Sequence, residues 1–303
     1  MRILLTGIRG QVGGALVPRL QGFGTIIAVD ESVLDFVQLA DISHTLDRLK
    51  PDLIINPAAY TAVDKAESEP DLALRVNGEG PAIVAQWAAL HSVPLIHFST
   101  DYVFNGAGER AWREDDEGQP LSVYGSSKLA GENAVRAAGG TFLIIRTSWV
   151  YAARGANFLR TVSRLARERK ELRIVADQIG APTTAAVLAD GVIAMLSSGL
   201  DAFCTRCAEA KGIVHLTTSG ETSWHGFASA IVDGLKARNV NLAVEQVLPL
   251  TTEQYPTPAK RPRNSRLDLT RLKAVFGLTM PHWRDALAPE LDALAQELAA
   301  TLA

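Results

Sequence analysis

Short apolar runs alternate with amphipathic stretches along the first half of the chain. The runs are rich in Val, Ile and Leu and are bounded by Gly, Pro, Asn or Asp, which is typical of buried strands. They fall at residues 2–6, 25–29, 53–56, 94–98 and 141–147. Helical periodicity lies between them, notably at 81–90 and 126–138. This alternation predicts an α/β fold with a doubly wound parallel sheet.

The pattern loosens after about residue 151. Shorter elements are interrupted there by glycines and by the proline-rich stretch 249–262. One further strand-like run, at 212–216, is expected to return to the sheet, and the Ala-rich stretch 287–303 is expected to form an amphipathic helix. We therefore predict a doubly wound domain at 1–151 and a smaller, mixed lobe at 152–303.

Composition changes this picture mainly by exclusion. The chain has 303 residues, 47% of them hydrophobic, and a formal net charge of −3, which favours a globular enzyme over a nucleic-acid-binding protein. The basic stretch 160–173 also carries Glu168 and Glu171, so we interpret it as a solvated helix face. No apolar run approaches the ~20 residues of a membrane span, and Met1 and Arg2 lead directly into a strand. A cytoplasmic protein without a membrane partner is expected.

Metal-binding and disulfide patterns are weak in this sequence. Cys204 and Cys207 form a lone Cys-x-x-Cys, for which a zinc site would need two more ligands. We expect a pair of reduced thiols. The histidines are scattered without ligand spacing, so no metal site is predicted.

A glycine-rich turn follows the first predicted strand and opens a helix. Gly7, Gly10 and Gly13 would permit a tight turn and bring backbone N–H groups close to a pyrophosphate at the helix N-terminus. The second strand ends in Asp30, where a carboxylate would hold the adenosine ribose hydroxyls. The combination predicts that the domain at 1–151 is a Rossmann domain that binds a dinucleotide.

Tyr124 and Lys128 lie four residues apart, which places a phenol and an ammonium on one helix face. A free phenol titrates near ~10, and a neighbouring cation favours its ionised form, so the pair suggests acid–base chemistry. Ser99 and Thr100 end a buried strand and should face the same edge of the sheet as the glycine turn. We therefore expect a hydroxyl, Tyr124 and Lys128 to converge on one nucleotide.

Seven blocks of the chain carry a resemblance to a known family. They lie at 7–13, 56–67, 99–106, 124–132, 146–151, 157–158 and 177–183. In this order and spacing they resemble the extended short-chain dehydrogenase/reductases and, within that group, the dTDP-4-dehydrorhamnose reductase family. The resemblance covers most of the chain. It implies a substrate-binding role for most of the lobe at 152–303.

The resemblance also implies roles in catalysis. Tyr124 is expected to protonate the C4 oxygen of a keto-sugar while a hydride arrives from a nicotinamide. Lys128 would lower the pKa of Tyr124 and hydrogen-bond the nicotinamide ribose. Thr100 would hydrogen-bond the developing alkoxide, with Ser99 as the alternative.

Cofactor residues follow from the same motifs. The matching positions are Gly7, Gly10, Gln11, Val12 and Gly13 for the pyrophosphate, Asp30 for the ribose, Asp41 and Ile42 for the adenine, and Ala58, Ala59 and Thr61 for the nicotinamide half. Asp30 favours NADH, because a 2′-phosphate would lie against its carboxylate. Arg9 could pair with that phosphate, and the family is known for tolerating both cofactors. NADPH and NADH therefore both stay open.

The implied substrate is a dTDP-sugar. Thr100, Asp101 and Tyr102 would lie on one side of the sugar, and the flat indole of Trp149 on the other. The nucleotide half is assigned to Asn157, Gln178 and Arg261, with Arg263 as an alternative to Arg261.

The resemblance implies reduction of dTDP-4-dehydro-β-L-rhamnose to dTDP-β-L-rhamnose, which feeds cell-surface polysaccharide. Two alternatives stay open: another nucleotide-sugar reductase or epimerase, and a non-catalytic regulatory subunit that binds a dinucleotide. Some relatives dimerise through magnesium held partly by an acidic side chain on the helix after the glycine turn. That helix has no carboxylate at 14–18 here, so a monomer or a metal-independent homodimer is expected.

Overall fold

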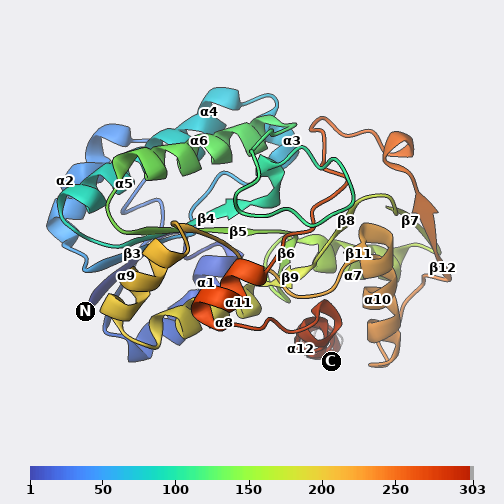
Figure 1. Cartoon of the computed structure of the whole chain (residues 1–303). Coiled ribbons are helices and arrows are strands. Elements are labelled where there is room, and N and C mark those ends of the chain that lie inside the picture. Colours follow the sequence, from blue (N-terminus) through green and yellow to red (C-terminus); the bar gives the residue numbers. More distant parts are fainter. Residues whose placement is uncertain (301–303) are drawn as a thin grey trace.

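Six parallel strands form the centre of the molecule, for which the computed structural model describes residues 1–300. Their order is β10-β5-β4-β3-β1-β2. They are β1 (Arg2–Leu5), β2 (Thr25–Ala28), β3 (Leu53–Asn56), β4 (Leu95–Thr100), β5 (Phe142–Thr147) and β10 (Ile213–His215). Figure 1 shows this sheet between two layers of helices. The predicted doubly wound α/β fold is confirmed.

Alternation along the strands explains the two layers. Ile3 and Leu5 of β1 pack into one hydrophobic cluster and Leu4 packs into another, because successive side chains of a strand point to opposite faces. The helices on the Leu4 face include α2 (Leu39–Leu49), α5 (Gly80–Leu90) and α6 (Val123–Ala138). Those on the other face are α1 (Gln11–Arg19), α8 (Ala185–Leu196), α9 (Leu200–Glu209) and α11 (Thr270–Phe276). Both faces of the sheet are thus covered, as a parallel sheet requires.

Short helical segments connect these layers. They are η1 (Leu20–Gly22), α3 (Val63–Ala66), α4 (Pro70–Leu74), the π-helical η2 (Arg75–Glu79) and η3 (Asp101–Val103). Helix α6 begins three residues before the predicted start at 126, because the Ser122 hydroxyl caps it by accepting a hydrogen bond from Gly125 N at 3.2 Å. The earlier start brings Tyr124 into the first turn of the helix.

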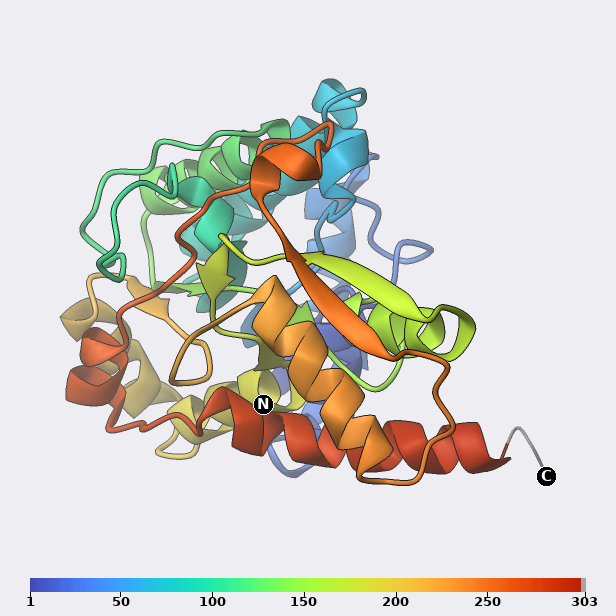
Figure 2. The same ribbon diagram turned by 90° about the vertical axis from the view of Figure 1, so that its right-hand side faces the viewer.

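A smaller lobe is built around a third hydrophobic cluster that contains Tyr151, Phe227 and Trp283. Its helices are α7 (Phe158–Glu168), α10 (Trp224–Lys236), α12 (Trp283–Ala300) and the short η4 (Thr252–Gln254). Its strands pair as β6 (Val150–Tyr151) with β9 (Thr183–Thr184), β7 (Glu171–Val175) with β12 (Gln246–Leu250), and β8 (Ile179–Gly180) with β11 (Thr222–Ser223). Figure 2 shows β7 and β12 side by side, with α10 and α12 nearby.

The C-terminal half contributes more to the sheet domain than predicted. Besides β10, the helices α8, α9 and α11 pack on the central sheet, so a boundary at 151/152 does not separate the two cores cleanly. The helix face expected over 160–173 is only partly correct. Helix α7 ends at Glu168, and Glu171–Val175 is a strand that pairs in parallel with β12. The alternation in Leu172, Arg173 and Ile174 was hidden by the surrounding charges.

Two further sequence predictions concern helices. Cys204 and Cys207 are free thiols on α9, as expected. Among the described helices, none is by itself long and apolar enough to cross a membrane. Helices α8 and α9 together would pass that test of length and composition, although they are bent by 105° relative to one another.

Candidate active site

The glycine turn lies between β1 and α1, at the carboxyl end of the sheet. Gly7 has a φ of +60°, and a Cβ there would lie 2.8 Å from Ala58 Cα, so only glycine fits without a backbone shift. A Cβ on Gly13 would lie 2.3 Å from the Gly7 carbonyl oxygen. Helix α1 begins after Gly10 without a side-chain cap, which leaves N–H groups of its first turn for an anion. These features fit a dinucleotide pyrophosphate.

Asp30 lies just past β2 and is held by three contacts. Its Oδ1 accepts hydrogen bonds from Ser32 N at 3.0 Å and Ser32 Oγ at 2.6 Å, and its Oδ2 lies 2.8 Å from Arg9 Nη2. Hydrogen bonds from Ser32, with Arg9, lower the pKa of the Asp30 carboxyl. Arg9 is largely exposed and also pairs with Glu31 at 2.7 Å. A carboxylate and a cation therefore lie side by side just past the end of β2.

The two residues predicted to contact the adenine differ in exposure. The Ile42 side chain is fully buried in the core beneath α2, so it is not available to a ligand. Asp41 lies on the exposed first turn of α2. The loop 30–38 connects β2 to α2. Ile42 belongs to the apolar face of α2, and this face packs on the core.

Residues 57–62 follow β3 and form the loop assigned to the nicotinamide half. Ala58 and Ala59 are half-buried and Thr61 is exposed. The Thr6 hydroxyl accepts a hydrogen bond from Ala58 N at 3.3 Å, which fixes this loop against β1. The loop therefore lies beside the glycine turn, between strands β1 and β3 where the strand order reverses.

Tyr124, Lys128 and Thr100 come together where α6 meets the end of β4. The Thr100 hydroxyl hydrogen-bonds to the Tyr124 phenol. Lys128 is buried, and its Nζ donates a hydrogen bond to the Phe98 carbonyl oxygen at 2.7 Å. The Tyr124 ring also packs edge to face with Tyr102, with centroids 5.4 Å apart. The spacing of four residues therefore places both side chains of α6 against one strand end.

The expected lowering of the Tyr124 pKa is wrong. Burial raises the pKa of Tyr124 to about 12, and its side-chain hydrogen bond with Thr100 lowers it only partly. Burial also lowers the pKa of Lys128 to about 8. Loss of solvation therefore outweighs the attraction that the sequence argument considered. A phenol with a pKa of about 12 is protonated at neutral pH, which suits a proton donor.

Ser99 and Thr100 face opposite sides of β4. Thr100 lies beside Tyr124, whereas the Ser99 hydroxyl donates to Glu132 Oε1 at 2.5 Å. The geometry therefore favours Thr100 as the hydroxyl at the site. Asp101 is buried and accepts a hydrogen bond from Thr100 Oγ1 at 3.1 Å. Burial raises the pKa of the Asp101 carboxyl to about 6.

Trp149 follows β5 at the carboxyl edge of the sheet. It has a φ of 49°, which is unusual for a bulky residue. Its half-buried indole stacks on Trp224 of α10, with ring centroids 3.6 Å apart and an angle of 11° between the planes. Gly180 also packs against it, since a Cβ there would lie 2.7 Å from Trp149 Cε2. In this structure the indole is thus already part of an aromatic stack.

Asn157 and Gln178 have structural partners. Asn157 caps α7, and its amide Nδ2 donates to carbonyl oxygens of its own loop and to Gln11 Oε1 at 3.3 Å. Its side chain thus joins the glycine turn to the lobe, which does not favour the predicted contact with the substrate nucleotide. Gln178 is buried and donates to Thr252 Oγ1 at 3.2 Å, so its side chain holds η4 in place.

Arg261 and Arg263 both form ion pairs. Arg261 makes a two-point contact with Asp64 of α3, with N–O distances of 3.0 Å and 2.7 Å, and this pair bridges the lobe and the cofactor domain. Arg263 is more exposed and pairs with Glu253. Arg261 also acts electrostatically on Tyr102, so it lies closer to the Thr100 and Tyr124 site. The structure therefore favours Arg261 over Arg263.

Sequence reasoning missed residues that hold the site together. Asn77 of η2 connects the nicotinamide loop to α6, because its side chain accepts from Tyr60 N at 2.8 Å and donates to Ser127 Oγ at 3.0 Å. Trp224 and Asp64 gave no local signal, because their partners are distant in sequence. Glu132 did have a signal, a carboxylate four residues after Lys128. Within residues 1–300, no group of three or more His, Cys, Asp or Glu side chains is placed to hold a metal ion.

Comparison with known proteins places this site in a family context. Residues 1–296 match the family model of the RmlD substrate binding domain. The dTDP-4-dehydrorhamnose reductase of Burkholderia thailandensis is 45% identical over 291 residues, which cover 95% of this chain and 97% of the relative. The reductase of Salmonella typhimurium is 42% identical, with 93% and 94% of the two chains covered.

A solved structure agrees with the sequence relatives. The dTDP-4-dehydrorhamnose reductase of Bacillus anthracis, in complex with NADP, is 34% identical and superposes with a TM-score of 0.86. The match covers 96% of this chain and 99% of that one. Both the sheet domain and the lobe are therefore shared with this relative.

Proposed function

The chain belongs to the family of the RmlD substrate binding domain, and from that premise we propose how its own residues carry out the family's reaction. The chain reduces the C4 keto group of dTDP-4-dehydro-β-L-rhamnose to the hydroxyl of dTDP-β-L-rhamnose, with NADPH or NADH as reductant. A predicted cytoplasmic location and a monomeric or metal-independent dimeric state remain predictions.

Tyr124 is the proton donor in this proposal. Its phenol is protonated at neutral pH and is oriented by the Thr100 hydroxyl, which is placed to hydrogen-bond the same substrate oxygen. The bound nicotinamide supplies the hydride that reduces C4. The C4 oxygen takes the phenolic proton, and the charged Lys128 ammonium then stabilises the tyrosinate that is left.

Trp149 and Arg261 are proposed to contact the substrate in addition to the three catalytic residues. Trp149 offers an aromatic edge or face at the mouth of the sheet, and Arg261 offers a guanidinium to the diphosphate. Arg261 is held by Asp64 at the boundary between the two domains. Substrate would thus contact the cofactor domain and the lobe together.

The observation that carries the proposal is the meeting of Thr100, Tyr124 and Lys128 at the carboxyl end of a parallel sheet, next to a glycine turn suited to a pyrophosphate. The test is oxidation of NADH and of NADPH, followed by absorbance, with dTDP-4-dehydro-β-L-rhamnose made in situ. We expect turnover with at least one cofactor and dTDP-β-L-rhamnose as product.

The alternatives predict different results in that assay. An epimerase would copurify with tightly bound NAD and would change the sugar without net cofactor oxidation. A regulatory subunit would bind the dinucleotide and leave the sugar unchanged. Either result would contradict the proposed reaction.

A further inference from the structure

Glu132 lies on α6, four residues after Lys128 and eight after Tyr124. Its carboxylate is fully buried. It accepts a hydrogen bond from Ser99 Oγ at 2.5 Å. It also accepts two hydrogen bonds from the Arg146 guanidinium, from Nε at 2.9 Å and from Nη2 at 2.6 Å. A buried carboxylate with three charge-assisted or short contacts is held rigidly.

Both partners of Glu132 lie at strand ends that border the site. Ser99 directly precedes Thr100 on β4 and follows Phe98, whose carbonyl oxygen holds Lys128. Arg146 on β5 is the register partner of Ser99. Glu132 therefore ties the helix that carries Tyr124 and Lys128 to the strand that carries Thr100.

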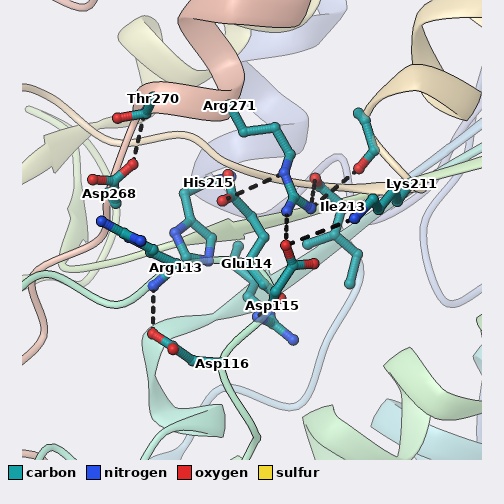
Figure 3. A network of polar contacts seen from close by, with 12 residues as sticks. Arg113, Glu114, Asp115, Asp116, Lys211, Ile213, His215, Asp268, Thr270 and Arg271 are labelled. Carbon is teal, nitrogen blue, oxygen red and sulfur yellow. Dashed lines mark hydrogen bonds and ion pairs between the residues drawn. The ribbon is translucent and has the colours of Figure 1, made fainter.

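No other carboxylate in the described structure contacts the Arg146 guanidinium. The acidic segment 114–117 lines a cavity of about 420 Å³ together with Glu132 and Arg146. Two of its carboxylates face Arg271 instead (Figure 3). Asp115 pairs with Arg271, and the Glu114 carboxylate is 3.6 Å from Arg271 Nε. The remaining contacts of Arg146 are the Glu114 carbonyl oxygen and the ring of Phe104. Among the described residues, Glu132 is therefore the only carboxylate that pairs with the Arg146 guanidinium.

We propose that Glu132 is a positioning residue for the reduction, which acts through Ser99 and Arg146 to hold Lys128 and Thr100 at the end of β4, beside the first turn of α6 that carries Tyr124. This inference rests on the function proposed above. The contacts of Glu132 are to strand ends and not to the site itself, so it does not touch the reacting atoms.

Glu132 also acts on Lys128 through its charge. Burial lowers the pKa of Lys128 to about 8, and the Glu132 carboxylate raises it. Burial keeps His97 of β4 neutral, and Asn77 of η2 carries no charge. The ionisable groups around Lys128 and Tyr124 are His97 on β4, Asp101 and Tyr102 on η3, and Glu132 on α6. Loss of the Glu132 charge should therefore make Lys128 lose its proton at lower pH.

The test compares Glu132→Gln with Glu117→Gln in full pH profiles of kcat. Glu117 lines the same cavity but is exposed, so it is a matched control for loss of one carboxylate. For Glu132→Gln we expect kcat to fall about tenfold or more near pH 8, a smaller fall near pH 6.5, and an alkaline limb moved to lower pH. The KM for NADPH should stay near that of the wild type, and Glu117→Gln should match the wild type throughout.

A second variant covers the case in which Glu132→Gln does not fold because Arg146 is left unpaired. Ser99→Ala removes the link to β4 and keeps the ion pair, so kcat should fall severalfold with the alkaline limb unmoved. A folded Glu132→Gln with the wild-type profile would overturn the proposal, and so would a Ser99→Ala variant with wild-type kcat. The wild type in the same assay separates the two levels of inference: no turnover of the dTDP-sugar by the wild type with either cofactor would contradict the proposed function itself, whatever the variants do.

Discussion

At the scale of single residues, Trp149 combines backbone strain with a place directly after β5, at the carboxyl edge of the sheet. A φ of 49° is costly for a bulky residue, and such strain is retained where the surroundings enforce it, often at ligand sites. The stack on Trp224 and the close packing of Gly180 supply that enforcement. The indole is therefore held at a fixed position before any substrate binds.

Trp149→Ala should raise the KM for the dTDP-sugar about tenfold, the equivalent of about 1.4 kcal/mol of lost aromatic contact, with little change in the KM for NADPH. Steady-state kinetics with each substrate varied in turn would measure this. Trp87→Phe is a matched control, because Trp87 lies on α5 and stacks on His91, away from the site. An equal rise in both KM values would contradict the assignment.

Arg9 and Asp30 are the two residues that we predict to decide between NADPH and NADH. Asp30 repels a 2′-phosphate, whereas Arg9, only 2.8 Å from it, attracts one. Arg9→Ala should therefore raise the KM for NADPH by roughly five- to tenfold and leave the KM for NADH within about twofold. Cofactor titrations at saturating sugar would test this. An equal change in the KM for NADPH and for NADH would show that Arg9 does not distinguish the 2′-phosphate from a 2′-hydroxyl.

At the scale of elements, the glycine turn depends on close contact between β1 and α1. A Cβ on Gly13 would lie 2.3 Å from the Gly7 carbonyl oxygen, whereas one on Gly14 would lie 3.3 Å from the Ile8 carbonyl oxygen. Gly13→Ala should therefore displace α1 and weaken NADPH binding at least tenfold, and Gly14→Ala should have a smaller effect. Fluorescence titration of NADPH into each folded variant would measure the difference. Equal affinities would contradict the packing argument.

Strand positions were predictable from sequence to within one or two residues, because each central strand is a short apolar run between polar or glycine residues. Strand β7 was not, since its exposed Arg173 lies in a charged stretch that favours a helix. The glycine turn and the Tyr124–Lys128 pair were also predictable from sequence, because the residues of each lie close together along the chain. The pairs Trp149–Trp224 and Asp64–Arg261 were not, because no local pattern brings together residues that far apart.

Solvation set a further limit on the sequence analysis. A Lys beside a Tyr suggests a lowered phenol pKa, but the degree of burial decides the sign, and burial is a property of the whole fold. The same holds for Ile42, whose motif position suggested a ligand contact although its side chain packs in the core.

At the scale of the whole molecule, buried histidines couple folding to pH. His97 and His215 are fully buried, and burial lowers the pKa of each well below its usual value. The unfolded chain takes up these protons near pH ~6.5, so the unfolded state binds more protons below that pH. Their contribution to stability is therefore present above about pH 6.5 and is lost as the pH falls.

The melting temperature should accordingly fall between about pH 7.5 and about pH 5.5, because the two histidines outweigh Asp101, whose pKa of about 6 contributes in the opposite direction over this range. His97→Gln keeps an acceptor for the Asn56 amide, which lies 3.2 Å from His97 Nδ1, and removes the titrating group. That variant should show a shallower fall than the wild type in calorimetry at a series of pH values. A melting temperature independent of pH over this range would contradict the account.

The most direct test of the central claim is a single-turnover measurement on Tyr124→Phe with preformed NADPH complex and dTDP-4-dehydro-β-L-rhamnose. The phenol is the assigned proton donor, so the rate of NADPH oxidation should fall by roughly two orders of magnitude or more relative to the wild type. NADPH affinity, titrated on the same sample, should remain close to the wild-type value. Oxidation at the wild-type rate by a variant without the phenol would show that another group donates the proton and would refute the assignment of Tyr124.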